Sequence, residues 1–167
     1  MKKLLLAITL IVGVSVAAIA QPRAIGGRLG WNLEFSYQHG FGKNFLEIDA
    51  GTYALWHGIH AAVVFDWVFA SPNWTPKGTW DWYAGVGGAG GFHWYEGEGS
   101  HDYQYAYAGV AGQIGLSYTF WFPLQLSIDY RPTIGVRFAG HEDGVHFHDQ
   151  GFFDFALGVR YAFGAGK

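Results

Sequence analysis

Residues 153–163 alternate strictly between large apolar side chains and polar or small ones. The odd positions hold Phe153, Phe155, Leu157, Val159, Tyr161 and Phe163. A period of two places the two sets on opposite faces of an extended strand. Nearly every readable segment of the chain repeats this pattern with aromatic residues toward its ends, which is typical of strands in a closed transmembrane β-barrel.

The first twenty residues predict an export signal. Lys2 and Lys3 precede an apolar run over 4–19 that closes on Ala18-Ile19-Ala20. A charged start, a short apolar middle and an Ala-x-Ala exit describe a secretory signal peptide, and the run is short for a membrane helix. We therefore expect a signal peptide at 1–20 and a mature domain at 21–167.

The composition of the remaining chain favours a barrel over other classes. Removing a leader with two lysines changes the formal charge from −3 to −5, which argues against nucleic acid as a partner. The chain is 50% hydrophobic and only 14% charged, yet no apolar stretch after the leader is long enough for a spanning helix. A closed barrel reconciles these facts. With no cysteine, the chain has no disulfides and no lipid attachment site after the leader.

The length after residue 20 fits an all-β, antiparallel barrel of about eight strands. Seven strands are readable, at 28–38, 45–56, 59–69, 80–87, 105–120, 124–138 and 153–163. Bacterial single-chain barrels have an even number of strands, so one strand is hidden, split or wrongly assigned. The candidates are an extension through 22–27 or a division within 44–70.

The alternation assigns a lipid face and a lumen face. Predicted lipid-facing residues include Leu29, Trp31, Leu33, Ile128, Tyr130, Leu157 and Val159. The predicted inward charges are Arg28, Glu34, Glu47, Asp49, Asp66, Asp129, Arg131, Arg137 and Arg160, together with Asp81 and Asp154. Charges inside a narrow ring must pair or meet water. They predict a structural network that plugs the barrel, or alternatively a lined path that favours cations.

The chain resembles the small outer-membrane β-barrel proteins of Gram-negative bacteria, the OmpX-like, OmpW-like and OmpA-transmembrane-domain-like group, over 26–163. Gly158, Tyr161 and Phe163 match the Gly-x-x-aromatic-x-aromatic assembly signal, although Ala156 and the tail 164–167 depart from it. The hairpin at 118–132 is similar to that of Bacteroidetes-type members. The resemblance implies an outer-membrane location among lipid and lipopolysaccharide, and insertion by the barrel assembly machinery. It implies no single activity.

Two motifs that could indicate chemistry lack the required context. Residues 85–90 satisfy G-x-G-x-x-G, but they lie within a strand and no helix follows, so we expect no cofactor. Ser100, His101 and Asp102 are consecutive in a loop, where neighbouring side chains diverge. No His-x-Ser pair lies at a strand end, which resemblance to lipid A deacylase barrels would require. The chain is not expected to be an enzyme.

A loop rich in histidine offers a metal hypothesis. His141, His146, His148 and Asp149 suit zinc, copper or nickel, and His101 with Asp102 could complete the shell. The alternative is an ordinary solvated loop, since nothing in the sequence fixes the ligand geometry.

Together these features predict a non-enzymatic integral outer-membrane protein with a structural or surface-interaction role through its extracellular loops. The alternatives are a narrow channel for ions or small solutes and a lipid A-modifying enzyme. The extracellular partner is not identifiable from the residues.

Overall fold

The computed structural model describes residues 21–52, 57–96, 102–139, 145–148 and 151–164, and it assigns none of them to a helix. No helix in these ranges is long and apolar enough to cross a membrane. The leader predicted at 1–20 lies outside the described residues. The strands are β1 (Gln21–Gly30), β2 (Leu33–Phe41), β3 (Asn44–Thr52), β4 (Gly58–Ala70), β5 (Thr79–Glu96), β6 (Asp102–Thr119), β7 (Gln125–Tyr130), β8 (Thr133–Ala139), β9 (Val145–His148) and β10 (Phe155–Ala162).

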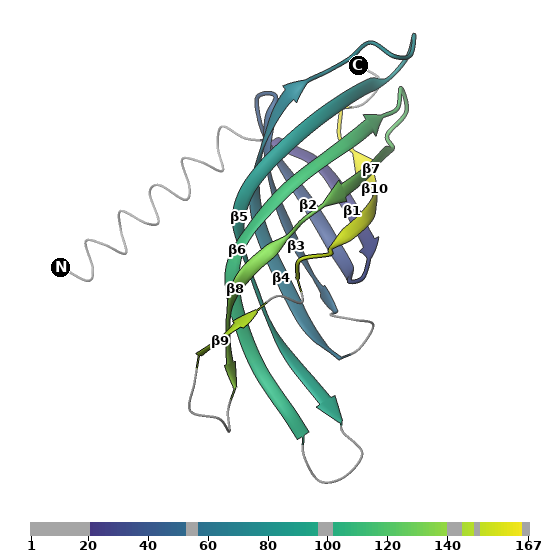
Figure 1. The fold of residues 1–167 in the computed structure, drawn as a ribbon. Helices are drawn as coiled ribbons and strands as arrows, with labels where there is room; N and C mark the ends of the chain where they lie inside the picture. The colour runs from purple at the N-terminus through teal and green to yellow at the C-terminus, as the bar shows by residue number, and fades with distance from the viewer. Residues whose placement is uncertain (1–20, 53–56, 97–101, 140–144, 149–150, 165–167) are drawn as a thin grey trace, which may run out of the picture.

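The strands form a closed antiparallel barrel (Figure 1). The order β5-β4-β3-β2-β1-β10-β7-β6 is closed by pairing between β5 and β6, which gives a ring of eight strands. β8 follows β7 after Arg131 and Pro132 and pairs with the other part of β6, and β9 then pairs with β8. Closure leaves the ring itself without an exposed edge.

The two ends of the barrel differ. Ala24 on β1 pairs with Ala162 on β10, so the start of the first strand and the end of the last lie together, at what we call the termini end. The turns around 42–43, 71–78 and 120–124 lie at this end as well. β5 and β6 reach beyond their neighbours at the opposite end, which we call the loop end (Figure 1).

The prediction of one strand over 28–38 is wrong. The segment divides into the end of β1 and the start of β2 around a turn at Trp31 and Asn32, with Leu29 paired to Leu33. Leu29 and Leu33 are cross-strand partners, so their side chains point to the same face of the sheet. Their separation along the chain is an even number of residues, which is also what one continuous strand requires of two residues on the same face. The alternation therefore runs unbroken through the turn and conceals it. β1 also extends back through 22–27, so these residues supply the hidden strand.

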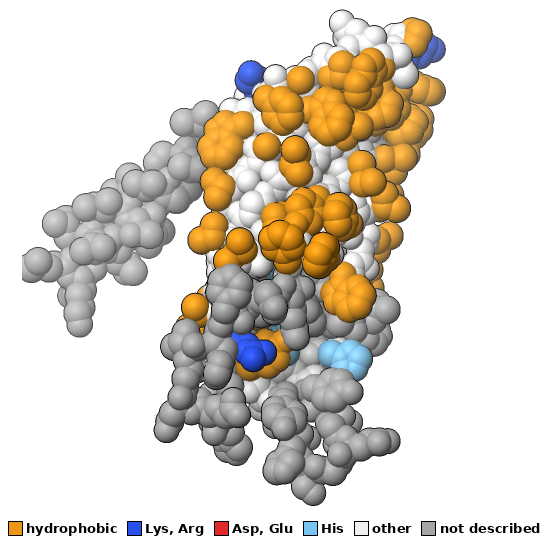
Figure 2. All heavy atoms as spheres, in the orientation of Figure 1, with side chains coloured by type: hydrophobic (Ala, Val, Ile, Leu, Met, Phe, Trp, Pro, Cys, Tyr) orange, Lys and Arg blue, Asp and Glu red, His pale blue; other side chains and the backbone are white. Residues whose placement is uncertain are grey.

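The alternation predicts the two faces of the wall correctly. Leu29, Trp31, Leu33, Ile128, Leu157 and Val159 are exposed on the outside, and Tyr130 is half-buried there against Phe155. Figure 2 shows a wall of mainly hydrophobic side chains, with lysine and arginine toward its ends. Among the side chains that the structure describes, the exposed Lys, Arg, Asp and Glu residues are Lys43 and Lys77, both in turns at the termini end. The last residues of the strand predicted at 45–56, residues 53–56, lie outside the described residues.

The interior holds three buried arginines on one side and a small apolar cluster among polar side chains on the other. Arg28 on β1 and Arg160 on β10 are fully buried. Across the ring, β4 to β6 contribute small residues, with Ala62, Val64, Ala89 and Ala111 forming one buried cluster. Next to this cluster the same strands also bury larger side chains, such as Tyr83 and Tyr107, so side chains from both halves of the ring fill the interior.

Candidate functional site

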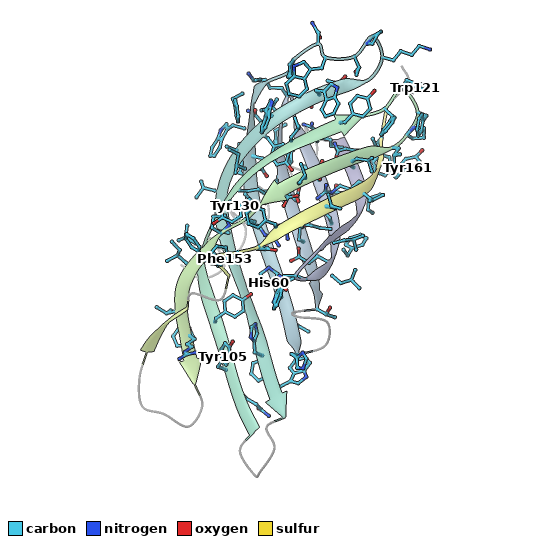
Figure 3. All side chains as sticks on the ribbon, turned by 45° about the vertical axis from the view of Figure 1, so that its right-hand side comes forward. His60, Tyr105, Trp121, Tyr130, Phe153 and Tyr161 are labelled. Atoms are coloured by element: carbon cyan, nitrogen blue, oxygen red, sulfur yellow. The ribbon has the colours of Figure 1, made fainter. Side chains whose placement is uncertain are left out.

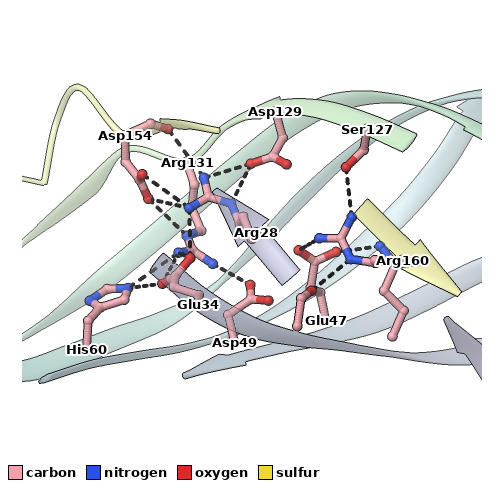
Figure 4. A network of polar contacts seen from close by, with 12 residues as sticks. Arg28, Glu34, Glu47, Asp49, His60, Ser127, Asp129, Arg131, Asp154 and Arg160 are labelled. Carbon is pink, nitrogen blue, oxygen red and sulfur yellow. Dashed lines mark hydrogen bonds and ion pairs between the residues drawn. The ribbon is translucent and has the colours of Figure 1, made fainter. Parts of the chain in front are cut away.

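The first half of the interior network is centred on Arg28. Arg28 and Glu34 are directly paired residues of β1 and β2, so both side chains enter the lumen side by side. The guanidinium of Arg28 lies 2.9 Å from Glu34, 2.7 Å from Asp129 and 3.0 Å from Asp154. These contacts join strands on both sides of β1, because Asp129 lies on β7 and Asp154 precedes β10. Figure 4 shows the guanidinium between these carboxylates.

A second guanidinium shares two of the same carboxylates. Arg131, just after β7, contacts Glu34 at 2.7 Å and Asp154 at 3.3 Å, and it also pairs with Asp49 of β3. Its side chain is fully buried. Glu34 and Asp154 therefore bridge two arginines (Figure 4), and the four carboxylates and two guanidiniums form one connected group.

Arg160 on β10 organises a separate group nearer the termini end. It donates hydrogen bonds to Glu47 at 2.8 Å, to Ser36 at 2.8 Å and to Ser127 at 2.7 Å. Glu47 also accepts a hydrogen bond from the side-chain amide of Gln38 at 2.6 Å. Each guanidinium nitrogen of Arg160 thus has a partner, which is the condition for burying a charge at moderate cost.

Two of the predicted lumen residues stand apart from these groups. Asp66 is fully buried, yet neither of its carboxylate oxygens has a hydrogen-bond partner among the described residues. Arg137 is half-buried on β8 and lies over the ring of Tyr105 at 5.8 Å. It follows Arg131 by six residues, about 20 Å along an extended strand, so it cannot reach the carboxylates around Arg131. The prediction that Arg137 joins the network is wrong.

Asp81 points inward as predicted but belongs to neither group. It pairs with Arg23 at 2.8 Å and accepts a hydrogen bond from Ser71 at 2.6 Å, at the termini end. The sequence interpretation did not include Arg23 among the lumen charges, because the predicted strand began only at residue 28.

His60 and Tyr107 are members of the site that the sequence interpretation did not assign to it. His60 on β4 contacts Glu34 at 3.1 Å through Nε2, and its Nδ1 is hydrogen-bonded to the hydroxyl of Tyr107 on β6. Both rings are buried. The alternation along β4 places His60 on the inward face, and this was the signal in the sequence that could have identified it. Its contact with Tyr107 on β6 could not be read in this way, because that contact depends on how the ring closes.

The interior holds an excess of acidic groups. Its buried ionisable groups are three guanidiniums and six carboxyl groups, from Arg28, Arg131, Arg160, Glu34, Glu47, Asp49, Asp66, Asp129 and Asp154. The guanidiniums therefore cannot balance every carboxylate one to one. Loss of an arginine increases this imbalance and loss of a carboxylate reduces it, so the two kinds of substitution have different expected costs.

The residues of the predicted assembly signal lie on β10 and directly after it. Tyr161 is exposed on the outer wall beside Phe163, with ring centroids 5.1 Å apart. Gly158 faces inward, where a Cβ would overlap the guanidinium of Arg160 and the hydroxyl of Ser127. The glycine thus has a packing role in this barrel, because it leaves room for the Arg160 hydrogen bonds.

The metal hypothesis is not tested by the described residues. His141 and Asp149 lie outside them, and for His146 and His148 only the backbone of β9 is described. Within the described part of the chain, no group of three His, Asp or Glu side chains is arranged to hold a metal ion. The loop site stays a prediction.

Comparison of the chain with protein-family models, with curated proteins and with solved structures finds no match. The functional conclusion therefore depends on the barrel and its interior.

Proposed function

We propose that the protein is an integral β-barrel of a bacterial outer membrane, with a blocked lumen, that acts without catalysis through the loops at its loop end. The observation that carries this proposal is the separation of side chains across one wall. Buried charges point into the ring, while the outside presents apolar residues. In water such a wall would be an unusually large apolar surface, whereas in a bilayer it is the required one.

The spacing of aromatic residues on the wall supports this environment. On β5, aromatic residues occupy the outward positions up to Trp82 and again from Phe92, with Ala84, Val86, Gly88 and Gly90 between them. Ten residues span about 33 Å along a strand, or about 25 Å along a barrel axis at a tilt near 40°. That is about the height of the apolar band of outer-membrane barrels. Phe153 and Phe163, both exposed, are separated by the same number of residues.

The distribution of rings in Figure 3 agrees with two aromatic zones. Trp121 and Tyr161 lie toward the termini end, whereas Tyr130 and Phe153 lie further toward the loop end. Aromatic girdles at both interfaces of the bilayer anchor such barrels. Lys43 and Lys77 lie beyond the first zone, where a lysine can reach the aqueous phase.

The filled interior supports a structural role over a channel. Two guanidiniums and four carboxylates cross the lumen between β1, β2, β3 and β7, with the Arg160 group beside them. On the β4 to β6 side the small apolar cluster, defined above as Ala62, Val64, Ala89 and Ala111, fills part of the interior between buried polar side chains such as Asp66 and Gln113. An ion crossing the ring would have to break buried charge pairs or pass an apolar constriction.

The same proposal assigns the partners. Lipid and lipopolysaccharide surround the wall, the barrel assembly machinery inserts the chain, and the loop end faces outward to contact a surface partner. The long β5 and β6 extension is the part of the described chain best placed for that contact (Figure 1).

Site-directed spin labelling tests the membrane location directly, because the chain has no cysteine of its own. A label at Val86→Cys, midway between the aromatic zones, should be more accessible to oxygen than to a water-soluble nickel reagent in lipid vesicles. A label at Lys77→Cys serves as the matched control and should show the opposite order. Nickel accessibility at Val86 equal to that at Lys77 would contradict membrane insertion. Cell fractionation of the full chain with outer-membrane markers then identifies which membrane is involved.

A further inference from the structure

A cavity of about 240 Å³ lies at the loop end of the barrel, next to the ion-pair network. Its lining includes the aromatic rings of Trp31 and Phe153 together with His60, Tyr107 and Asp154. These residues come from the turn between β1 and β2, from β4, from β6 and from the segment before β10. Figure 3 places Phe153 and His60 in the same region of the barrel, and Figure 4 places His60 beside the network that holds Asp154.

Backbone hydrogen bonds fix the segment that carries the acidic group of this cavity. The N–H of Arg131 donates to the carbonyl of Asp154 at 2.8 Å, and the N–H of Thr133 donates to the carbonyl of Gly151 at 3.0 Å. Gly151 lies so close to Thr133 that a Cβ would come within 2.9 Å of it. The cavity wall is therefore built by the barrel and not by a free loop.

The connected group next to the cavity has more carboxyl groups than guanidiniums. The side chains of Arg28 and Arg131 are fully buried, while the Asp154 side chain retains 8% exposure. The connected group contains two guanidiniums and four carboxylates, and Asp154 is the carboxylate among them that lines the cavity. An incoming cation would share the Asp154 carboxylate with Arg28 and Arg131 and would reduce the acidic excess of the group.

The walls of the cavity favour an organic cation over a metal ion. Trp31 and Phe153 both line the cavity, and both also reach the outer surface of the barrel, so they lie where the cavity opens. Aromatic faces attract ammonium groups through the ring quadrupole, and they supply no ligand to a metal. Of the described residues, no three His, Asp or Glu side chains converge as metal ligands.

We propose that this cavity binds a small organic cation, a primary or quaternary ammonium group, with its charge toward Asp154 and its apolar body beside Trp31 and Phe153. The site is made by the closed barrel and can be measured on the folded protein in detergent.

Calorimetric titration of the folded mature chain with choline tests the proposal. The neutral isostere 3,3-dimethyl-1-butanol has nearly the same shape without the charge, and it serves as the matched ligand. We expect choline to bind at least about tenfold more tightly than the alcohol, since the carboxylate and the rings both favour the charged form. Equal affinities, or no binding of choline, would overturn the proposal.

Variants then locate the site. Trp31→Leu should weaken choline binding by about threefold to fivefold, since an exposed cation–π contact has a value in that range. Trp121→Leu removes an exposed tryptophan at the termini end and should leave the affinity unchanged. Asp154→Asn should weaken binding by about tenfold or more if the variant folds. If it does not fold, the comparison of the two tryptophan variants still decides: equal choline affinity in both would contradict binding at this cavity.

Discussion

Substitution of Arg160 by methionine removes the centre of the second buried group while keeping most of the side-chain volume. Arg160 is 1% exposed and is the guanidinium paired with Glu47, whose own exposure is 0%. After the substitution, Glu47 keeps the amide of Gln38 as its described partner, and the hydroxyls of Ser36 and Ser127 each lose a donor.

The expected cost follows from leaving a carboxylate buried without its counter-charge. Breaking a buried ion pair by removing one partner costs about 3–5 kcal/mol. The acidic excess inside the barrel places Arg160→Met toward the upper part of this range. Adding Glu47→Gln should recover part of the loss, because it neutralises the unpaired carboxylate and leaves an amide that can bond to Gln38.

Urea unfolding of the barrel in lipid vesicles, followed by tryptophan fluorescence and by heat-modifiable gel mobility, measures this cost. Arg23→Met is the matched control, because Arg23 and Asp81 pair at 2.8 Å with side chains that are 19% and 14% exposed. Its expected cost is on the order of 1 kcal/mol. If Arg160→Met unfolded at the same urea concentration as Arg23→Met, or if Glu47→Gln brought no recovery, the buried pair would not have the role assigned to it.

Three other substitutions test the interior, the wall and assembly. Asp66→Asn should change stability by less than about 1 kcal/mol or increase it, because the carboxylate has no hydrogen-bond partner among the described residues; a large loss in the same urea assay would indicate a missing partner. Leu157→Arg should cost about 2–4 kcal/mol in the bilayer, since Leu157 is exposed on the wall; assembly equal to the parent protein would contradict the face assignment. Tyr161→Ala/Phe163→Ala should lower outer-membrane abundance in cells, as judged by immunoblotting of membrane fractions, and unchanged abundance would remove these residues from the assembly signal.

The faces of the wall could be predicted from the sequence because they depend on a local property. In a strand, the position of a side chain relative to its neighbours decides its face, so Leu29 and Arg28 separate correctly without knowledge of their partners. The same rule failed to divide β1 from β2. Leu29 and Leu33, on either side of the turn, both face outward, so the alternation continues through the turn without a break.

The contacts of the interior could not be predicted in the same way. Arg28 meets Asp129 across 101 positions and Asp154 across 126 positions of the chain. Two inward residues can touch only if they lie at the same height along the barrel axis. That height depends on the stagger between neighbouring strands around the ring, and no local sequence pattern specifies the stagger. This is why His60 and Tyr107 were missed as partners, and why Arg137 was predicted to lie in a network that it cannot reach.

Planar-bilayer recording on the folded mature chain tests most directly whether the barrel, which we propose to span a membrane, is blocked. The charge pairs of Arg28, Arg131 and Arg160 cross the lumen, so we expect heat-modifiable, inserted protein to give no steady current at moderate voltage. Arg160→Met/Glu47→Gln provides a loosened barrel for comparison under the same conditions. A persistent open current from the parent protein would contradict the blocked barrel and would favour a narrow channel.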